Sequence, residues 1–377
     1  MNISIVGMGS VSALGNTFSE VCQSYQESQS FLKIYNQYPI GKLSESGQIA
    51  VENLRQSVKT YTDLDDTALF AILSARQAIA QTNWNNGNFG VNIGSSRGAT
   101  ALFEKHYSYF VENKQCEVLA SPTTTLGNIA SWVGQDLGST GFEMSHSITC
   151  STALHAVANG IAWIQSGMEQ RFVVGGSEAP LTPFTIAQAK ALKIYSNLTE
   201  GFLCRAMDMF KKQNTMVLGE GAAVFCLEKG LKNNRLATII GVGFASEKLT
   251  HSVSLSANGE CLQKSMRMAL QSTDLVDVDI IVTHTPGTVK GDLAEIEAIH
   301  ELFKDKIPFL TNNKWKIGHT FGASGALSLE MAICMLQNQQ IYIVPYVEKQ
   351  KLPNKIEKIL INAVGFGGNA VSVLIER

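Results

Sequence analysis

The chain has 377 residues, of which 45% are apolar and 16% charged, so it can bury a sizeable core. Lysine and arginine number 30 against 32 aspartates and glutamates, which gives a formal net charge of −2 at pH 7. This near-neutral balance supplies no overall field for a nucleic-acid backbone or an anionic membrane, and no apolar run is long enough to cross a bilayer. We therefore predict a globular protein that binds neither nucleic acid nor membrane.

The seven cysteines form no C-x-x-C pair and are scattered, which excludes a disulfide scaffold and favours a reducing compartment. The start of the chain has no basic and apolar segment of signal type. These features predict a cytoplasmic location. We expect six of the cysteines to be small buried hydrophobic residues: Cys22, Cys116, Cys204, Cys226, Cys261 and Cys334.

Short β-rich runs alternate with stretches of helical length through much of the chain, which favours an α/β fold. In chain order the pattern predicts a strand at 3–6, helices at 67–81 and 151–165, strands at 172–174, 222–227 and 239–242, a helix at 259–273, a strand at 280–282, helices at 291–303 and 322–337, and strands at 359–362 and 371–375.

The stretches 151–165 and 322–337 are rich in alanine, glycine and aliphatic residues on nearly every face, the pattern of a helix buried all round. Cys150 stands just before the first of them, and His319 just before the second. A similar element in each half, with a reactive residue at its start, indicates an internal duplication.

Cys150 is the strongest candidate for a nucleophile. It precedes a predicted helix, whose positive N-terminal end favours thiolate over thiol. His284 follows a predicted strand and His319 precedes a buried helix, positions from which a side chain can serve a site. Cysteine and histidine together suit acyl transfer, hydrolysis or peptide cleavage. His146 and His155 flank Cys150, but no second cysteine is near, so we predict no metal site.

In these residues the chain resembles the β-ketoacyl-acyl carrier protein synthases, the elongating condensing enzymes of the thiolase superfamily. The resemblance covers the chain from end to end and follows motifs in order: 5–16 (IVGMGSVSALGN), 147–153 (SITCSTA), 174–178 (VGGSE), 219–223 (GEGAA), His284 with Thr288, Gly291, Asp292 and Glu295, Lys314 with 318–320 (GHT), and 365–368 (GFGG).

The resemblance implies a five-layered α-β-α-β-α fold of two similar halves, 1–235 with the nucleophile and 236–377 with two catalytic histidines. The active site would lie where the halves meet. Cys150 would carry an acyl chain as a thioester, while His284 and His319 would assist the decarboxylation of a malonyl extender.

The same resemblance implies further roles. The backbone N–H groups of Cys150 and Phe366 would form an oxyanion hole, and Lys314 would organise the site electrostatically. The expected substrate-binding residues are Thr288, Thr320, Gly365 and Gly367. No metal or cofactor is implied, because the substrates are carried on the phosphopantetheine of acyl carrier protein, which is the expected partner. A dimer is expected, either with an identical chain or with a chain-length-factor-like subunit.

Two other functions are alternatives. A catalytically silent partner subunit of the chain-length-factor kind resembles these enzymes but lacks the nucleophile, which this chain keeps. A Cys-His acyl hydrolase would use the same residue types. Thiolases have a second catalytic cysteine near the C-terminus, whereas this chain has none after Cys334. Starter-unit synthases pair cysteine with histidine and asparagine, whereas this chain has His319 as a second histidine.

Several residues depart from the family pattern. Pro286 stands where a pantetheine-binding threonine is usual, so Thr288 would act alone or with water. The segment 211–216 (KKQNTM) replaces an Arg-Asp-Gly-Phe motif and is two residues longer. Ser328 replaces a carboxylate, and the pattern leaves open whether Glu330 compensates. These changes and the short chain resemble synthases that make aryl polyene or flexirubin-type pigments.

No motif identifies the acyl pocket, so the chain length and unsaturation of the substrate are not readable from the sequence. The segment 103–110 (FEKHYSYF) is our expectation for part of that pocket. Acyl carrier proteins are acidic, and we expect a basic patch at the pantetheine opening, with these candidates: Lys190, Lys193, Arg205, Lys211 and Lys212.

Overall fold

The computed structural model describes residues 2–84, 87–248 and 255–377, and its main strands form two five-stranded sheets. The first sheet has the order β1-β8-β6-β4-β5 and the second β11-β10-β12-β13-β9. The strands of the first are β1 (Ile3–Val11), β4 (Gly90–Gly94), β5 (Glu143–Met144), β6 (Arg171–Glu178) and β8 (Gly221–Lys229). Those of the second are β9 (Ala237–Ser246), β10 (Ile280–Val282), β11 (Phe309–Thr311), β12 (Lys358–Gly365) and β13 (Asn369–Glu376).

The two sheets repeat one pattern of strand pairing. In the first sheet, β4 pairs in parallel with β5 and β6, while β8 pairs antiparallel with β6 and β1. In the second, β10 pairs in parallel with β11 and β12, while β13 pairs antiparallel with β12 and β9. The duplication that the two buried helices indicated is therefore visible in the topology. The boundary after residue 235 stays a prediction.

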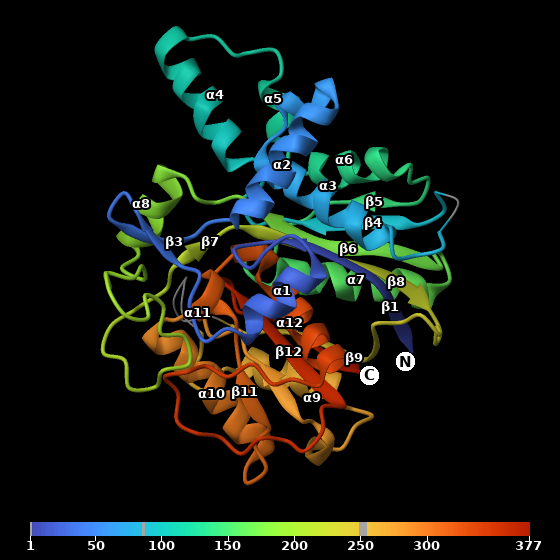
Figure 1. Ribbon diagram of the computed structural model, residues 1–377, viewed down its shortest axis with the longest axis vertical. Helices are drawn as coiled ribbons and strands as arrows, with labels where there is room; N and C mark the ends of the chain where they lie inside the picture. Colours follow the sequence, from blue (N-terminus) through green and yellow to red (C-terminus); the bar gives the residue numbers. More distant parts are fainter. Residues whose placement is uncertain (1, 85–86, 249–254) are drawn as a thin grey trace.

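Helices complete the five layers (Figure 1). Between the sheets lie α7 (Thr152–Ser166) and α12 (Ser324–Asn338), which contact strands of both. The helices α3 (Asp66–Ile79) and α6 (Asn128–Leu137) cover the outer face of the first sheet, and α9 (Glu260–Ala269) and α10 (Val289–Phe303) that of the second. The predicted five-layered thiolase-like fold is confirmed.

Small residues allow the two central helices to pack closely. Every residue of α12 from Ser324 to Leu336 is buried, as expected for a helix with apolar residues on all faces. At Gly325 an added Cβ would lie 2.7 Å from Leu154 Cγ on α7, too close for any side chain. This contact brings together the N-terminal ends of the two helices, beside which the site lies.

All seven predicted strands and all five predicted helices are present. The remaining elements were not predicted: α1 (Phe18–Gln26), β2 (Lys33–Tyr35), β3 (Tyr38–Gly41), α2 (Glu45–Ser57), α4 (Thr100–Asn113), α5 (Ala120–Thr124), α8 (Pro183–Ala191), β7 (Leu218–Gly219) and α11 (Lys314–Ile317), together with β4, β5, β11 and α6. Short 3-10 turns cover Lys59–Asp63, Leu275–Asp277 and Phe321–Ala323. Of the cysteines expected to be buried, Cys116 is exposed, because it lies in a loop after α4.

Among the described helices, none has the length and apolar character needed to cross a membrane. The cytoplasmic location stays a prediction.

Candidate active site

Cys150 lies in the turn that leads into α7. Thr149, just before it, has a φ of 48°, in the left-handed region that a β-branched residue rarely occupies. Two contacts hold this turn: the Thr149 hydroxyl donates to the Phe366 carbonyl at 3.0 Å, and the Ser96 hydroxyl donates to the Thr149 carbonyl at 2.6 Å. Such local strain persists where the surroundings fix it, and here it places the cysteine at the start of the helix.

Burial decides the ionisation of the Cys150 thiol. The residue is only 6% exposed, and burial, with a further contribution from the Glu178 carboxylate, raises its pKa to about 12. The Phe366 backbone N–H and the charge of Lys314 act in the opposite direction but are weaker. Desolvation of the thiol thus opposes the helix N-terminus, which favours the thiolate.

The loop that follows β12 approaches Cys150 at Gly365. At Gly365 an added Cβ would lie 1.9 Å from Thr149 Oγ1 and 3.0 Å from the Cys150 nitrogen, so no side chain fits. The Phe366 amide consequently reaches the thiol. The Phe366 backbone is thus close to the Cys150 thiol, and the oxyanion hole expected from the N–H groups of Cys150 and Phe366 stays a prediction.

His284 follows β10 and is held by its backbone. The two oxygens of the buried Glu295 carboxylate accept from the His284 and Thr285 N–H groups at 2.9 and 2.7 Å. Glu295 also accepts from the Asn362 side chain at 3.1 Å. The carboxylate on α10 thus fixes the turn that carries the histidine.

His319 is held against the N-terminal half. Its N–H donates to the Val217 carbonyl at 2.6 Å, and its carbonyl accepts from the Gly219 N–H at 3.1 Å, beside β7. These backbone bonds carry a residue of the second half into contact with the first. The predicted site between the halves follows from this geometry.

The two imidazoles meet edge to face, with ring centroids 5.1 Å apart and an angle of 86° between their planes. Burial, helped by the charge of Lys314, lowers the pKa of His319 to about 3 and holds that of His284 well below its usual value. The Nδ1 atoms of both rings are buried without a partner in the described part of the chain. The lowered pKa values favour the neutral form of both rings at pH 7, and both residues line the cavity.

Lys314 is 1% exposed and close enough to both histidines to act on them electrostatically. Its Nζ donates to the Ser328 hydroxyl at 2.9 Å and to the Thr283 carbonyl at 3.5 Å. Burial lowers its pKa to about 8. Glu330 does not compensate for Ser328, because its carboxylate accepts from the Tyr25 hydroxyl instead.

A cavity of about 550 Å³ joins these groups. It brings together Cys150, His284, His319, Thr288, Gly365, Phe366 and Gly367. Its wall is completed by residues that the sequence did not single out for this role: Leu192, Ile194, Gln213, Asn214, Met216, Leu255, Val289, Lys290, Phe321, Val364 and Gly368. A second and larger cavity, between β3, α2 and α8, contains none of the predicted catalytic or substrate-binding residues, but Lys190, expected at the pantetheine opening, lines this cavity instead.

Thr288 keeps its expected place on the cavity wall. Its hydroxyl oxygen accepts from the Gly291 N–H at 3.2 Å as the N-cap of α10, and this leaves the hydroxyl proton available to a ligand. Pro286 lines the cavity beside it and offers no donor. On this side of the cavity, Thr288 offers one hydroxyl, where the family pattern has a second one at the position of Pro286.

Two expectations about binding residues are corrected. Thr320 is fully buried and does not line the cavity, because its methyl group packs near Gly219 beneath His319. The segment 103–110 lies on α4, which has no buried residue and projects from the body of the protein (Figure 1). Neither contributes to the cavity around Cys150 in this chain.

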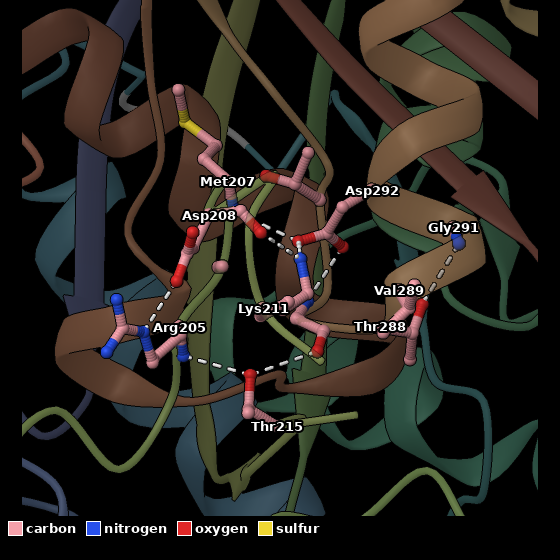
Figure 2. Close-up of polar contacts among 12 residues, drawn as sticks. Arg205, Met207, Asp208, Lys211, Thr215, Thr288, Val289, Gly291 and Asp292 are labelled. Atoms are coloured by element: carbon pink, nitrogen blue, oxygen red, sulfur yellow. Dashed lines mark hydrogen bonds and ion pairs between the residues drawn. The ribbon is translucent and has the colours of Figure 1, made fainter. Parts of the chain in front are cut away.

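Lys211 is not a surface residue, contrary to the expected basic patch. Its ammonium group, 3% exposed, lies 2.8 Å from Asp292 Oδ2 and also donates to the Asp208 carbonyl at 2.9 Å. Figure 2 shows that Asp292 in turn accepts from the Met207 N–H at 2.9 Å. The pair ties the longer loop to the start of α10. Lys212, the next residue, is exposed and lies at the cavity.

Sequence reasoning gave no role to Glu295, to Ser328 as the partner of Lys314, or to Asp292 as the partner of Lys211. Glu295 and Asp292 were recognised as motif residues, and an acidic residue in the first turns of a helix signals contact with nearby backbone N–H groups. Among the described residues, no group of three or more metal-ligating side chains is placed to hold a metal ion.

Comparison with known proteins identifies the family. The beta-ketoacyl synthase N-terminal domain matches residues 1–233, and the C-terminal domain matches residues 236–347. The chain is 27% identical over 409 residues to 3-oxoacyl-[acyl-carrier-protein] synthase 1 of Buchnera aphidicola subsp. Baizongia pistaciae (strain Bp), covering 99% of this chain and 98% of that protein.

Solved structures share the fold. A chain of AntDE:AntF, a type II PKS acyl-carrier protein in complex with its ketosynthase, superposes with a TM-score of 0.86 at 19% identity, covering 100% of this chain and 98% of that one. A chain of the ketosynthase ApeO in complex with its chain length factor ApeC, from Xenorhabdus doucetiae, gives 0.81 at 18% identity, covering 100% and 98%. With both family domains matched in order, the chain belongs to the beta-ketoacyl synthase family of acyltransferases, as its motifs predicted.

Proposed function

We propose that this protein catalyses the decarboxylative Claisen condensation of malonyl-acyl carrier protein with an acyl group held on Cys150. The observation that carries the proposal is the single cavity in which one buried thiol meets two neutral, perpendicular imidazoles. The acyl thioester exchanges onto the sulfur, and the freed carrier thiol takes up the proton. Loss of CO2 from the malonyl group then leaves an enolate, whose carbon attacks the acyl-cysteine and releases the thiolate and 3-oxoacyl-carrier protein.

Each half-reaction creates a negatively charged oxygen, and different groups donate hydrogen bonds to these two oxygens. In acyl transfer, the tetrahedral oxygen is stabilised by the N–H groups of Cys150 and Phe366. In decarboxylation, the enolate oxygen is stabilised by Nε2–H groups of His284 and His319. Neutral rings act here as hydrogen-bond donors without a metal, and the buried charge of Lys314 lies near them.

The direct test is mass spectrometry of the products formed from acyl- and malonyl-loaded carrier protein. The expected product is 3-oxoacyl-carrier protein with one equivalent of CO2. Release of free fatty acid without condensation would support the hydrolase instead, and a chain that neither accepts an acyl group nor releases CO2 would be the silent partner. Both substrates arrive on phosphopantetheine, and the proposal includes no resident cofactor or metal.

The same assay addresses the pathway. We propose a synthase of specialised polyene biosynthesis, of the aryl polyene or flexirubin type, on the basis of Pro286, Ser328 and the longer 211–216 loop. Such an enzyme should extend an unsaturated acyl or aryl-primed thioester faster than a saturated one of equal length. Equal rates on both would contradict the pathway and leave the condensation untouched.

Acyl carrier protein is the proposed partner at the mouth of the cavity, where Lys212 and Lys290 are exposed. We expect Lys212→Glu to raise the KM for carrier-protein substrates several-fold at low salt, an effect that fades as salt screens exposed charges over about 8–10 Å. A small pantetheine thioester should react as with the wild type.

Lys355→Glu is the matched control, since Lys355 is exposed and does not line this cavity. Equal losses on the carrier-protein substrate and the small thioester would show that Lys212 acts on loop structure. Lys211 is unsuitable for this test because it is buried against Asp292.

We also propose that the chain works as a dimer. The helix α4 has no buried residue and exposes aromatic side chains at Phe103, Tyr107 and Phe110, while β5 is the edge of its sheet. Covering such a helix and edge would favour association. Light scattering should give about 82 kDa, twice 40.9 kDa, for a homodimer. An active species of 40.9 kDa would contradict any dimer, and rescue by co-expression would indicate a chain-length-factor-like partner.

A further inference from the structure

Lys314 is a buried cation whose nearest side-chain partner is a hydroxyl. Its Nζ contacts Ser328 Oγ at 2.9 Å, and none of the ion pairs in the described part of the chain includes it. Fully buried lysines are nearly always paired with an acid. The positive charge of Lys314 therefore lies near the reacting groups without an ion-pair partner, and the carboxylates of Glu295 and Asp292 act on it only from beyond salt-bridge distance.

The acids near Lys314 are engaged elsewhere. On α10, Glu295 accepts from two backbone N–H groups and an amide, and Asp292 accepts from Lys211. On α12, Glu330 accepts from Tyr25. The other titratable groups that face Lys314 from packed elements are the thiols Cys150 and Cys204 and the two imidazoles.

We infer that Ser328 is a positioning residue for the condensation: its hydroxyl holds the Lys314 ammonium near His284 and His319 without the ion pair that a carboxylate at this position would form. Ser328 is fully buried on α12, about one turn from the start of this helix. The packing of α12 therefore fixes the position of its hydroxyl. A hydroxyl orients the ammonium through one hydrogen bond. A carboxylate at the same place would orient it equally well but would cancel its field.

The consequence lies in the decarboxylation half-reaction, so the inference rests on the proposed function. A positive charge fixed before the reaction stabilises the enolate oxygen as it becomes negative, and no reorganisation is needed. The charge also adds to burial in lowering the pKa of both imidazoles. Because burial lowers the pKa of Lys314 to about 8, the field should disappear as the pH rises through that value, and CO2 release should fall with it.

The experiment compares Ser328→Ala, Ser328→Asp and Ser328→Thr with the wild type. CO2 release from malonyl-carrier protein is measured from pH 5.5 to 10, with thermal unfolding as a check of folding. The alkaline limb is the pH range in which the rate of CO2 release falls. In Ser328→Ala, which loses a partner of the ammonium, this limb should move to lower pH. It should move up by about one to three pH units in Ser328→Asp, whose carboxylate favours the charged lysine. Ser328→Thr keeps the hydroxyl and should retain the wild-type limb.

A purely structural role would lower the maximum rate in all variants without moving the limb, and an unmoved limb in folded Ser328→Ala and Ser328→Asp overturns the inference. If Ser328→Asp does not fold, the comparison of Ala with Thr decides it. Alkylation of Cys150 by iodoacetamide gives a readout that is independent of turnover, because the charge of Lys314 lowers the pKa of this thiol.

Alkylation should be slower in Ser328→Asp than in Ser328→Thr at pH 7, and equal rates would count against the inference. A wild type that releases no CO2 would refute the proposed function, whereas the alkylation comparison would still test the link from Ser328 through Lys314 to the site.

Discussion

Replacing Cys150 by alanine should abolish acyl transfer from acyl carrier protein and, with it, all formation of 3-oxoacyl product. Cys150 is the one cysteine among the residues that line the described cavity, so the acyl-enzyme bond has no other thiol on which to form at this site. Intact-mass measurement after incubation with acyl-carrier protein, followed by peptide mapping, should locate the adduct on Cys150 in the wild type and find none in the variant.

The matched control is Cys226→Ala, which removes an equally buried thiol from β8, outside the cavity. It should acylate normally if it folds. An adduct mapped to another cysteine in the wild type would show that the nucleophile is misassigned.

The raised pKa of Cys150 adds a second expectation. With its pKa raised by burial to about 12, the thiol is protonated in nearly all molecules at pH 7. Alkylation of the free enzyme should therefore be slow and should rise about tenfold per pH unit between pH 6 and 8. A plateau in that range would mean that the thiolate is already formed and that the helix dipole outweighs burial.

The sequence predicts the long and fully buried elements well because their composition is decided by burial. The strand 371–375 and the helix 322–337 consist mostly of apolar and small residues, and both are buried between other layers. In contrast, β5 has only two residues, and the three of β11 (Phe309–Thr311) lack the run of β-branched aliphatic residues that marks the equally short β10. They become strands through pairing with β4 and β10.

The site could be predicted in its residues but not in its electrostatics. Cys150, His284 and His319 each stand beside the end of an element, and their order along the chain matches a known family. The exposure of neighbouring lysines could not be predicted in the same way. Lys211 is buried by an ion pair with Asp292, 81 residues away, while Lys212 is exposed. Local sequence carries no signal of such a contact.

His284→Ala and His319→Ala should each lower the rate of malonyl decarboxylation by roughly 100- to 1,000-fold, the usual cost of one lost oxyanion donor. Acylation of Cys150 should survive in both variants, because the oxygen that becomes negative in that step is bound by backbone N–H groups. The measurements are CO2 release from malonyl-carrier protein and intact-mass acylation, made on the same preparations. His300→Ala, on the exposed face of α10, is the matched control and should keep both activities.

The pH dependence tests how the histidines act. Because burial holds the pKa of both rings far below 6.5, they are neutral in the folded enzyme throughout the range from pH 5.5 to 7. Wild-type decarboxylation should therefore be flat across that range, and a limb centred near 6.5 would show that one ring titrates normally and works as a cation. Full decarboxylation by either alanine variant would remove that histidine from the enolate-binding pair, whereas loss of acylation together with decarboxylation would mean that the ring supports the nucleophile instead.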